Sequence, residues 1–315
     1  YMIMYGIIYA LLENDIRRIL AYSIVNQVGF MLVGIGIGTQ LSINGAITHA
    51  FAHIIYKALL LMSAGSVIYM TQKRRCTDVG GLYRTMPITT ICGIIGALAI
   101  SSFPLTSGFT TKSMIVSGAA YEHLFNVWIL LVAASAGVFL HAGIKFPWFV
   151  FFQKDSGLRP EEPPKNMLLA MVLLSLLCVL FGIFPNLLYQ LLPFDKLYIP
   201  YTSDHVIFQL QLLLFAGLAF FVMLPWLKRT LTITLDFDWF YRTGLIKLLD
   251  TLKKVISSYD IFINNIISNL KIFFDNRIND SFNTETGVGK NHWMTGNMVF
   301  ALSIILLIYL LVLLF

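Results

Sequence analysis

Long apolar runs separated by short polar loops make up most of the chain. A membrane-spanning helix needs about 20 mostly apolar residues, and several runs reach that length. The expected spans cover the end of a first span at 1–12 and then 19–38, 44–70, 86–121, 126–152, 167–192, 206–227 and 294–315. The run at 86–121 is interrupted by Pro104, Ser107 and Gly108. The pattern predicts an all-α polytopic membrane protein with about eight transmembrane segments, one of them a broken helix.

The segment 228–293 has a different pattern, because charged residues occur throughout it. From Leu245 onward its apolar positions recur about every 3.6 residues, and the opposite face carries mostly lysine, aspartate, serine and asparagine. This pattern is typical of an amphipathic helix that lies along a surface and does not cross the bilayer. A helix over 243–278 would extend for roughly 54 Å.

Composition supports membrane residence. Hydrophobic residues make up 57% of the 315 positions and charged residues 12%, whereas about 25% charge is typical of soluble domains. The net charge of +6 is carried largely by short loops between apolar runs. Basic residues in such loops set the orientation of a membrane protein, so this charge does not indicate nucleic-acid binding. Cys76, Cys92 and Cys178 form no C-x-x-C pair, so we expect no iron–sulfur cluster, structural zinc or other cofactor.

The loops predict how the chain is oriented. The basic loops around Arg17 and Arg74 are separated by two expected spans, so they share a side, which is expected to be cytoplasmic. If 86–121 crosses the membrane once, segment 228–293 lies on that same side, and if it crosses twice, on the other. The positive-inside rule therefore favours one broken helix. Because Tyr1 stands inside an apolar run without a charged region before it, we expect a fragment or split product and not a signal peptide.

Two histidines and two lysines stand out because they lie well inside expected spans. His49, His53 and Lys57 stand at i, i+4 and i+8 of one helix, within about 80° of one another. Lys112 follows the helix break. An ammonium in the bilayer costs at least about 2.5–3.5 kcal/mol, so such groups normally face the bundle interior or a hydrated path. Imidazole and buried lysine both exchange protons, and we interpret the set as a proton relay.

Other interpretations of these residues stay open. The two histidines could be interior residues bonded to neighbouring carbonyls. The H-x-x-x-H spacing also fits a metal site, although Lys57 and the lack of a carboxylate on the stripe argue against metal. Lys112 alone could extend to the membrane interface.

Two further pairs are candidate path residues. His141 and Lys145 stand at i, i+4 near the end of their span, where a relay role and an interfacial role are equally consistent with the sequence. Glu122 and His123 stand at the end of the broken helix, where they could form the mouth of a path.

Three long motifs carry a resemblance to a known family. They are NDIRRILAYSIVNQVGFMLVGIG at 14–36, ITHAFAHIIYKALLLMSAGSVI at 47–68 and ISSFPLTSGFTTKSMI at 100–115. In this order they resemble the antiporter-like subunit family, which includes the proton-pumping membrane subunits of respiratory complex I and large subunits of Mrp-type Na⁺/H⁺ antiporters. The residues at 141–167 look most like the Mrp-type D subunit. The DFDWFYRTG segment and the long amphipathic helix resemble the tail of the largest complex I antiporter-like subunit.

The resemblance implies a fold and a role for each residue. Family members have two inverted repeats of five spans, each with a broken helix and a key lysine. His49, His53 and Lys57 correspond to the connecting relay of the second repeat, and Lys112 to its key lysine. The first repeat, with its glutamate and lysine pair, is not part of this sequence. Either that upstream half is a separate polypeptide or piece, or the fragment is expected to be inactive alone. The implied organisation is a second repeat at 1–152, two further spans at 153–227, a cytoplasmic-side lateral helix at 228–293 and a final anchor at 294–315.

The resemblance favours a proton-translocating subunit in a bacterial plasma membrane or its equivalent. The leading interpretation is the D subunit of a Mrp-type monovalent cation/H⁺ antiporter, with other subunits, protons and Na⁺ or K⁺ as partners. One alternative is an antiporter-like subunit of NADH-quinone oxidoreductase, in which redox chemistry belongs to partner subunits. Another is a structural subunit without transport. An enzyme acting on lipid-linked substrates is disfavoured, because no carboxylate lies inside an expected span.

Overall fold

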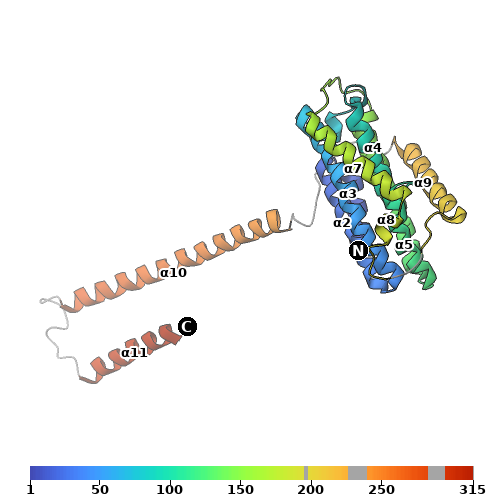
Figure 1. Ribbon diagram of the computed structural model, residues 1–315. Coiled ribbons are helices and arrows are strands. Elements are labelled where there is room, and N and C mark those ends of the chain that lie inside the picture. The colour runs from blue at the N-terminus through green and yellow to red at the C-terminus, as the bar shows by residue number, and fades with distance from the viewer. Residues whose placement is uncertain (195–197, 226–239, 283–294, 315) are drawn as a thin grey trace. The chain divides into compact units, whose positions relative to one another are not determined.

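A computed structural model describes residues 1–194, 198–225, 240–282 and 295–314 (Figure 1). The chain forms two compact units, Tyr1–Thr234 and Leu235–Phe315, each described below by itself. The described residues of both units are largely helical and contain no β-strand beyond one isolated bridge between Asp15 and Arg75. An all-α polytopic architecture is therefore confirmed.

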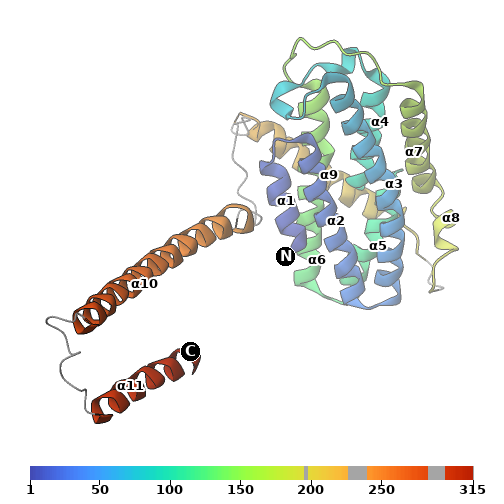
Figure 2. The same cartoon turned by 90° about the vertical axis from the view of Figure 1, so that its left-hand side faces the viewer.

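The first unit is a bundle of membrane-length and shorter helices (Figure 2). Its α-helices are α1 (Met2–Leu12), α2 (Ile16–Ile37), α3 (Gln40–Thr71), α4 (Pro87–Ile100), α5 (Ser107–Tyr121), α6 (Phe125–Val138), α7 (Lys165–Ile183), α8 (Asn186–Tyr189) and α9 (Ser203–Met223). Helix α6 continues through π-helical turns at Phe139–Lys145 and Trp148–Phe152, and short 3-10 turns occupy Cys76–Asp78 and Leu82–Arg84. Six helical stretches of the described chain are long and apolar enough to cross a membrane, five of them in this unit.

Local sequence fixes where the first helices begin and end. The Asp15 carboxylate accepts hydrogen bonds from the backbone amides of Arg17 and Arg18 and so caps the start of α2. Gly38, at φ 77°, ends that helix in the left-handed region that favours glycine. Thr39 and Ser42 form a capping box that starts α3. The two long helices thus pack as neighbours joined by a tight turn.

The interrupted apolar run at 86–121 forms two helices, α4 and α5, that follow one another along α3. They contain 14 and 15 residues, roughly 20 Å each, and both pack against α3 (Figure 2). The intervening segment includes Pro104, and Ser102 and Leu105 adopt positive φ angles of 59° and 67°. A Cβ added at Gly108 would overlap the carbonyl oxygen of Ala99, so the start of α5 approaches the end of α4 backbone to backbone. The single broken helix expected from loop charge is confirmed.

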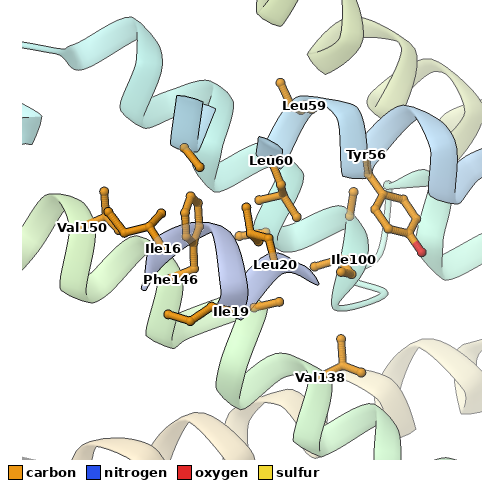
Figure 3. Close-up of a cluster of buried hydrophobic side chains, with 14 of the residues drawn as sticks. Ile16, Ile19, Leu20, Tyr56, Leu59, Leu60, Ile100, Val138, Phe146 and Val150 are labelled. Atoms are coloured by element: carbon orange, nitrogen blue, oxygen red, sulfur yellow. The ribbon is translucent and has the colours of Figure 1, made fainter. Parts of the chain in front are cut away.

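A cluster of buried side chains holds the bundle together (Figure 3). The cluster draws on most helices of the unit. The members labelled in the close-up come from α2, α3, α4 and the long α6 helix: Ile16, Ile19, Leu20, Tyr56, Leu59, Leu60, Ile100, Val138, Phe146 and Val150. Large apolar side chains on α7 and α9, such as Leu176 and Leu214, are instead exposed at 61% and 66%. Outward apolar faces of this kind are expected for helices bordered by lipid or by other membrane subunits.

The two basic loops meet at one end of the first unit. The amide of Ile16 donates to the carbonyl of Arg74 over 2.9 Å, and the Arg74 guanidinium lies 3.6 Å from the Asp15 carboxylate. Nearby, the Arg159 guanidinium and the Gly157 amide hold the pKa of Asp155 well below its usual range, because both hydrogen bonds stabilise the ionised carboxylate. The expectation that these loops share a side is confirmed.

The opposite end of the bundle gathers the turn before α3, the end of α5 and the segment before α9. A Cβ added at Gly118 would lie 3.0 Å from the Cβ of Ser42. The Asn44 amide donates to the Phe194 carbonyl over 2.8 Å, and the hydroxyls of Ser117 and Tyr198 are 3.1 Å apart. This end is therefore the one distant from the basic loops.

The second unit contains two long helices. Helix α10 (Leu245–Phe282) has 38 residues, follows a π-helical turn at Phe240–Gly244 and extends for roughly 57 Å. Its length and amphipathic pattern confirm the expected helix over 243–278. Helix α11 (Thr295–Leu314) matches the final apolar span. The rest of segment 228–293, at 228–239 and 283–293, lies outside the described residues, and the side of the membrane on which α10 lies stays a prediction.

Candidate functional site

The ring of His49 lies between α2 and α5, with both nitrogens near polar partners. Its Nε2 is 3.0 Å from Gln27 Oε1 and its Nδ1 is 3.2 Å from Thr111 Oγ1. The side chain is completely buried. Helix α3 contributes the histidine, and the residue before Lys112 on α5 contributes the hydroxyl. The structure therefore brings the histidine stripe next to the residue expected to be the key lysine.

A chain of hydrogen bonds fixes which nitrogen of His49 carries the proton. The Asn26 amide nitrogen donates to the carbonyl of Ile3, which can only accept, over 2.9 Å. The Asn26 oxygen then accepts from the Gln27 nitrogen over 2.6 Å, which leaves the Gln27 oxygen to face His49. Because that oxygen also only accepts, Nε2 of His49 is the donor and Nδ1 faces the Thr111 hydroxyl. Gln27 and Asn26 are site residues that the sequence reasoning missed, although amides inside an apolar span were a visible signal.

Lys112 is buried at the helix break, 2% exposed. Its Nζ donates to the carbonyl of Ile100 over 3.1 Å and lies 4.8 Å from the ring centroid of Phe30. Ile100 is the last residue of α4, where the break leaves carbonyl oxygens without intrahelical donors. A helix C-terminus and an aromatic face both favour a cation. The end of α4 at the helix break therefore supplies the carbonyl group that binds the Lys112 ammonium.

His53, Lys57 and His141 present buried nitrogens to the interior. Within the described part of the chain, Nε2 of His53, Nζ of Lys57 and Nε2 of His141 have no hydrogen-bond partner. The other nitrogen of His141 is 2.8 Å from the carbonyl of Gly137. His141 is also close enough to Lys57 and Lys145 to interact with them electrostatically. His141 thus presents a further buried imidazole nitrogen from the continuation of α6, within electrostatic range of Lys57.

Lys145 has a different environment. Its Nζ donates to the carbonyl oxygens of Ala10, Leu11 and Glu13 over 2.5, 2.6 and 2.8 Å. These three acceptors match the three N–H groups of an ammonium and lie at the C-terminal end of α1, where a cation is favoured. The side chain joins α6 to α1 as a helix cap.

Glu122 and His123 lie in the exposed turn between α5 and α6, at the end of the bundle distant from the basic loops. His123 adopts a positive φ of 54°. Their role as the mouth of a path stays a prediction.

Comparison with known proteins identifies a family and several relatives to which this chain is similar. Residues 1–139 match the family described as NADH:quinone oxidoreductase/Mrp antiporter, TM. Over 187 residues the chain is 32% identical to a probable K⁺/H⁺ antiporter protein of Rhizobium meliloti, its A/B subunit, in a match that covers 57% of this chain and 19% of that protein. Over 128 residues it is 41% identical to NADH-ubiquinone oxidoreductase chain 5 of Mammuthus primigenius, which covers 40% of this chain and 21% of that one.

A solved structure shares the fold over nearly the whole chain. The membrane-bound sulfane sulfur reductase, an archaeal respiratory membrane complex, gives a TM-score of 0.60 at 26% identity and covers 98% of this chain and 54% of that one. The matches to the two relatives named above span only about a fifth of each relative's length. The segment 1–139, which carries the His49 stripe and Lys112, is thus the part of the chain that is similar to the family described as NADH:quinone oxidoreductase/Mrp antiporter, TM.

Proposed function

We propose that the chain is a proton-translocating, antiporter-like subunit of a multisubunit membrane complex. His49, His53, Lys57 and Lys112 pass protons through the middle of the membrane. The observation that carries this proposal is the contact of His49 with Thr111, directly beside Lys112, because it links the stripe on α3 to the lysine at the helix break. The match of residues 1–139 to the family described as NADH:quinone oxidoreductase/Mrp antiporter, TM, supports the same role.

The stripe on α3 has the spacing that a relay requires. Its three members are one helical turn apart and together extend for roughly 12 Å along the helix. Two of them present a buried nitrogen without a hydrogen-bond partner in the described chain, so a lone pair or an N–H is available for proton exchange. His141 adds a further imidazole from α6.

The two buried lysines that have hydrogen-bond partners differ in the number of carbonyl groups that accept from them. Lys112 has one carbonyl acceptor, so releasing its proton disrupts one hydrogen bond. Lys145 has three, and deprotonation would leave at least one buried carbonyl without a donor. The geometry supports Lys112 as the group that exchanges protons and Lys145 as a structural cation.

Within this function we propose a Mrp-type D subunit that exchanges H⁺ for Na⁺ or K⁺ together with partner subunits. The similarity to a probable K⁺/H⁺ antiporter protein supports it. The second candidate is a complex I-like subunit that couples electron transfer in partners to proton pumping. It is favoured by the 41% identity to NADH-ubiquinone oxidoreductase chain 5 and by the structural match to a respiratory complex.

The test uses inverted membrane vesicles that contain the full complex, with Lys57→Ala and Lys112→Ala. Antiport predicts that added Na⁺ or K⁺ dissipates a preformed pH gradient and that both substitutions abolish this effect. The matched control is Lys73→Ala, which removes an exposed lysine outside the spans and should retain transport. NADH-driven acidification that both substitutions abolish, without a cation response, would favour the complex I type. Transport that survives both substitutions would reject the relay and favour a structural subunit.

A further inference from the structure

His141 lies in a π-helical part of the long α6 helix, at Phe139–Lys145. Such turns are rare and occur frequently at functional sites. The segment packs against α1, α2, α4 and α9. A Cβ added at Gly143 would overlap the hydroxyl of Ser101, so the segment closely approaches the end of α4. The His141 side chain is completely buried.

A backbone contact fixes which nitrogen of the neutral His141 ring carries the hydrogen. Nδ1 is 2.8 Å from the carbonyl oxygen of Gly137, four residues earlier in α6. Because a carbonyl oxygen only accepts, Nδ1 carries a hydrogen and donates it. The other nitrogen, Nε2, is left with a lone pair and no hydrogen. Nε2 is buried and has no hydrogen-bond partner among the described residues, so its lone pair is available to a proton.

Lys57 has the chemistry to supply that proton. Its Nζ is buried and, in the part of the chain that the structure describes, likewise has no hydrogen-bond partner. An ammonium group only donates, whereas the Nε2 lone pair of His141 only accepts. His141 also lies within electrostatic range of Lys57. The two atoms are therefore a matched proton donor and acceptor, one on α3 and one on the continuation of α6.

The His141 ring exchanges protons at one nitrogen only. Its Nδ1 faces a backbone carbonyl, which does not carry a proton onward. The next basic group on the segment, Lys145, donates to three carbonyl oxygens and has no lone pair. By contrast, Nδ1 of His49 faces the Thr111 hydroxyl, which both accepts and donates. A proton that His141 takes up at Nε2 must therefore leave from Nε2.

We propose that His141 is a terminal proton-holding site of the relay, which accepts a proton from Lys57 at Nε2 and returns it from the same atom. In the transfer, direct or through a water molecule, one Nζ–H bond of the Lys57 ammonium breaks and its electron pair stays on Nζ. An Nε2–H bond forms on the imidazole, and the Nδ1 hydrogen stays on Gly137. The holding role rests on the proposed function, whereas the position of the ring hydrogen rests on the geometry alone.

Infrared difference spectroscopy of the full complex with isotope-labelled histidine rings tests the position of the hydrogen. The two neutral tautomers of imidazole differ in their ring vibrations, so the signal lost in a variant reports the tautomer of the ring removed. At mildly alkaline pH, His141→Gln should remove the signal of a ring protonated at Nδ1. The matched control, His49→Gln, should remove that of a ring protonated at Nε2. Loss of an Nε2-protonated signal in His141→Gln would overturn the holding site.

Proton flux per assembled complex in sealed vesicles tests the holding role. His141→Gln should lower the flux by roughly three- to tenfold, because the relay loses a place to hold a proton and keeps every link. His49→Gln, which removes a link, should abolish it. Flux abolished equally in both variants would make His141 an obligatory link, and unchanged flux in His141→Gln would remove it from the relay. Either result contradicts a terminal holding site.

A second variant separates proton holding from a structural role of the same ring. Glutamine at position 141 keeps an N–H donor for the Gly137 carbonyl, whereas His141→Phe removes it. Proton holding predicts the same loss of flux in both variants, because neither side chain titrates. Normal flux in His141→Gln with loss in His141→Phe would assign His141 a structural role and overturn the holding site.

The measurements also separate this inference from the relay itself. Flux that survives Lys57→Ala and Lys112→Ala would reject the relay and the holding role with it, while the tautomer of His141 could still be as the structure shows. Flux that depends on both lysines and not on His141 would support the relay and overturn the holding site.

Discussion

The Lys145 ammonium donates a hydrogen bond to the Ala10 carbonyl oxygen over 2.5 Å, although the two residues are 135 positions apart. This contact, with those to Leu11 and Glu13, ties the π-helical part of α6 to the C-terminal end of α1. The bond places the Lys145 side chain at the end of the bundle where the basic loops meet. It also separates the structural role of Lys145 from the exchanging role proposed for Lys112.

Lys145→Met should destabilise the bundle by about 2–5 kcal/mol, because three buried carbonyl oxygens lose their donor. The thermal unfolding midpoint of the detergent-solubilised complex measures the loss. Lys165→Met, at an exposed lysine that begins α7, is the control and should leave the midpoint almost unchanged. A variant of normal stability that has lost transport would show instead that Lys145 exchanges protons.

Gln27→Leu should lower the transport rate by roughly tenfold, because it removes the acceptor that orients His49. Tyr56→Phe is the matched control: the Tyr56 hydroxyl donates to the same Gln27 oxygen over 3.2 Å, but its loss leaves the Gln27–His49 contact in place. We expect an effect below about threefold for the control. Proton flux per assembled complex is the measurement, and equal effects of the two substitutions would contradict the orienting role of Gln27.

The carboxylate of Glu162 caps the start of α4 from a loop 74 positions away. It accepts from the amides of Ile88 and Thr89 over 2.6 and 3.3 Å. Glu162→Ala should cost about 0.5–2 kcal/mol, the usual value of an N-terminal cap. Hydrogen exchange at residues 88–90 should accelerate, while Glu161→Ala, at an exposed neighbour, should leave it unchanged. Unchanged exchange in Glu162→Ala would show that the loop does not stabilise α4.

Features encoded by neighbouring residues could be predicted from the sequence. The helix break follows from Pro104 and Gly108, and the stripe of His49, His53 and Lys57 follows from helical periodicity. The long helix α10 was equally visible, because its apolar positions recur with the helical period over 38 residues.

Contacts between distant segments could not be predicted in this way. The chain of hydrogen bonds from Ile3 through Asn26 and Gln27 to His49 depends on how α1, α2 and α3 pack. The acceptors of Lys145 likewise lie more than 130 positions away from it. The sequence also singled out Glu122 and His123 at the end of the broken helix as a possible mouth of a path, and that role stays a prediction.

Gly108→Ala should disrupt the broken helix, because the added Cβ would overlap the backbone oxygen of Ala99. Since this oxygen belongs to the helix backbone, α4 and α5 must separate, and the 3.1 Å bond from Lys112 to Ile100 is lost with them. We expect destabilisation of about 2–4 kcal/mol and loss of transport.

Gly36→Ala is the matched control, since no atom lies within 4 Å of its added Cβ, and alanine in a helix should stabilise by up to about 1 kcal/mol. Unfolding midpoints and proton flux of the two variants distinguish steric disruption of the break from a general intolerance of glycine substitution. If Gly108→Ala retained both stability and flux, the close approach of α4 and α5 would not be what positions the Ile100 carbonyl for Lys112.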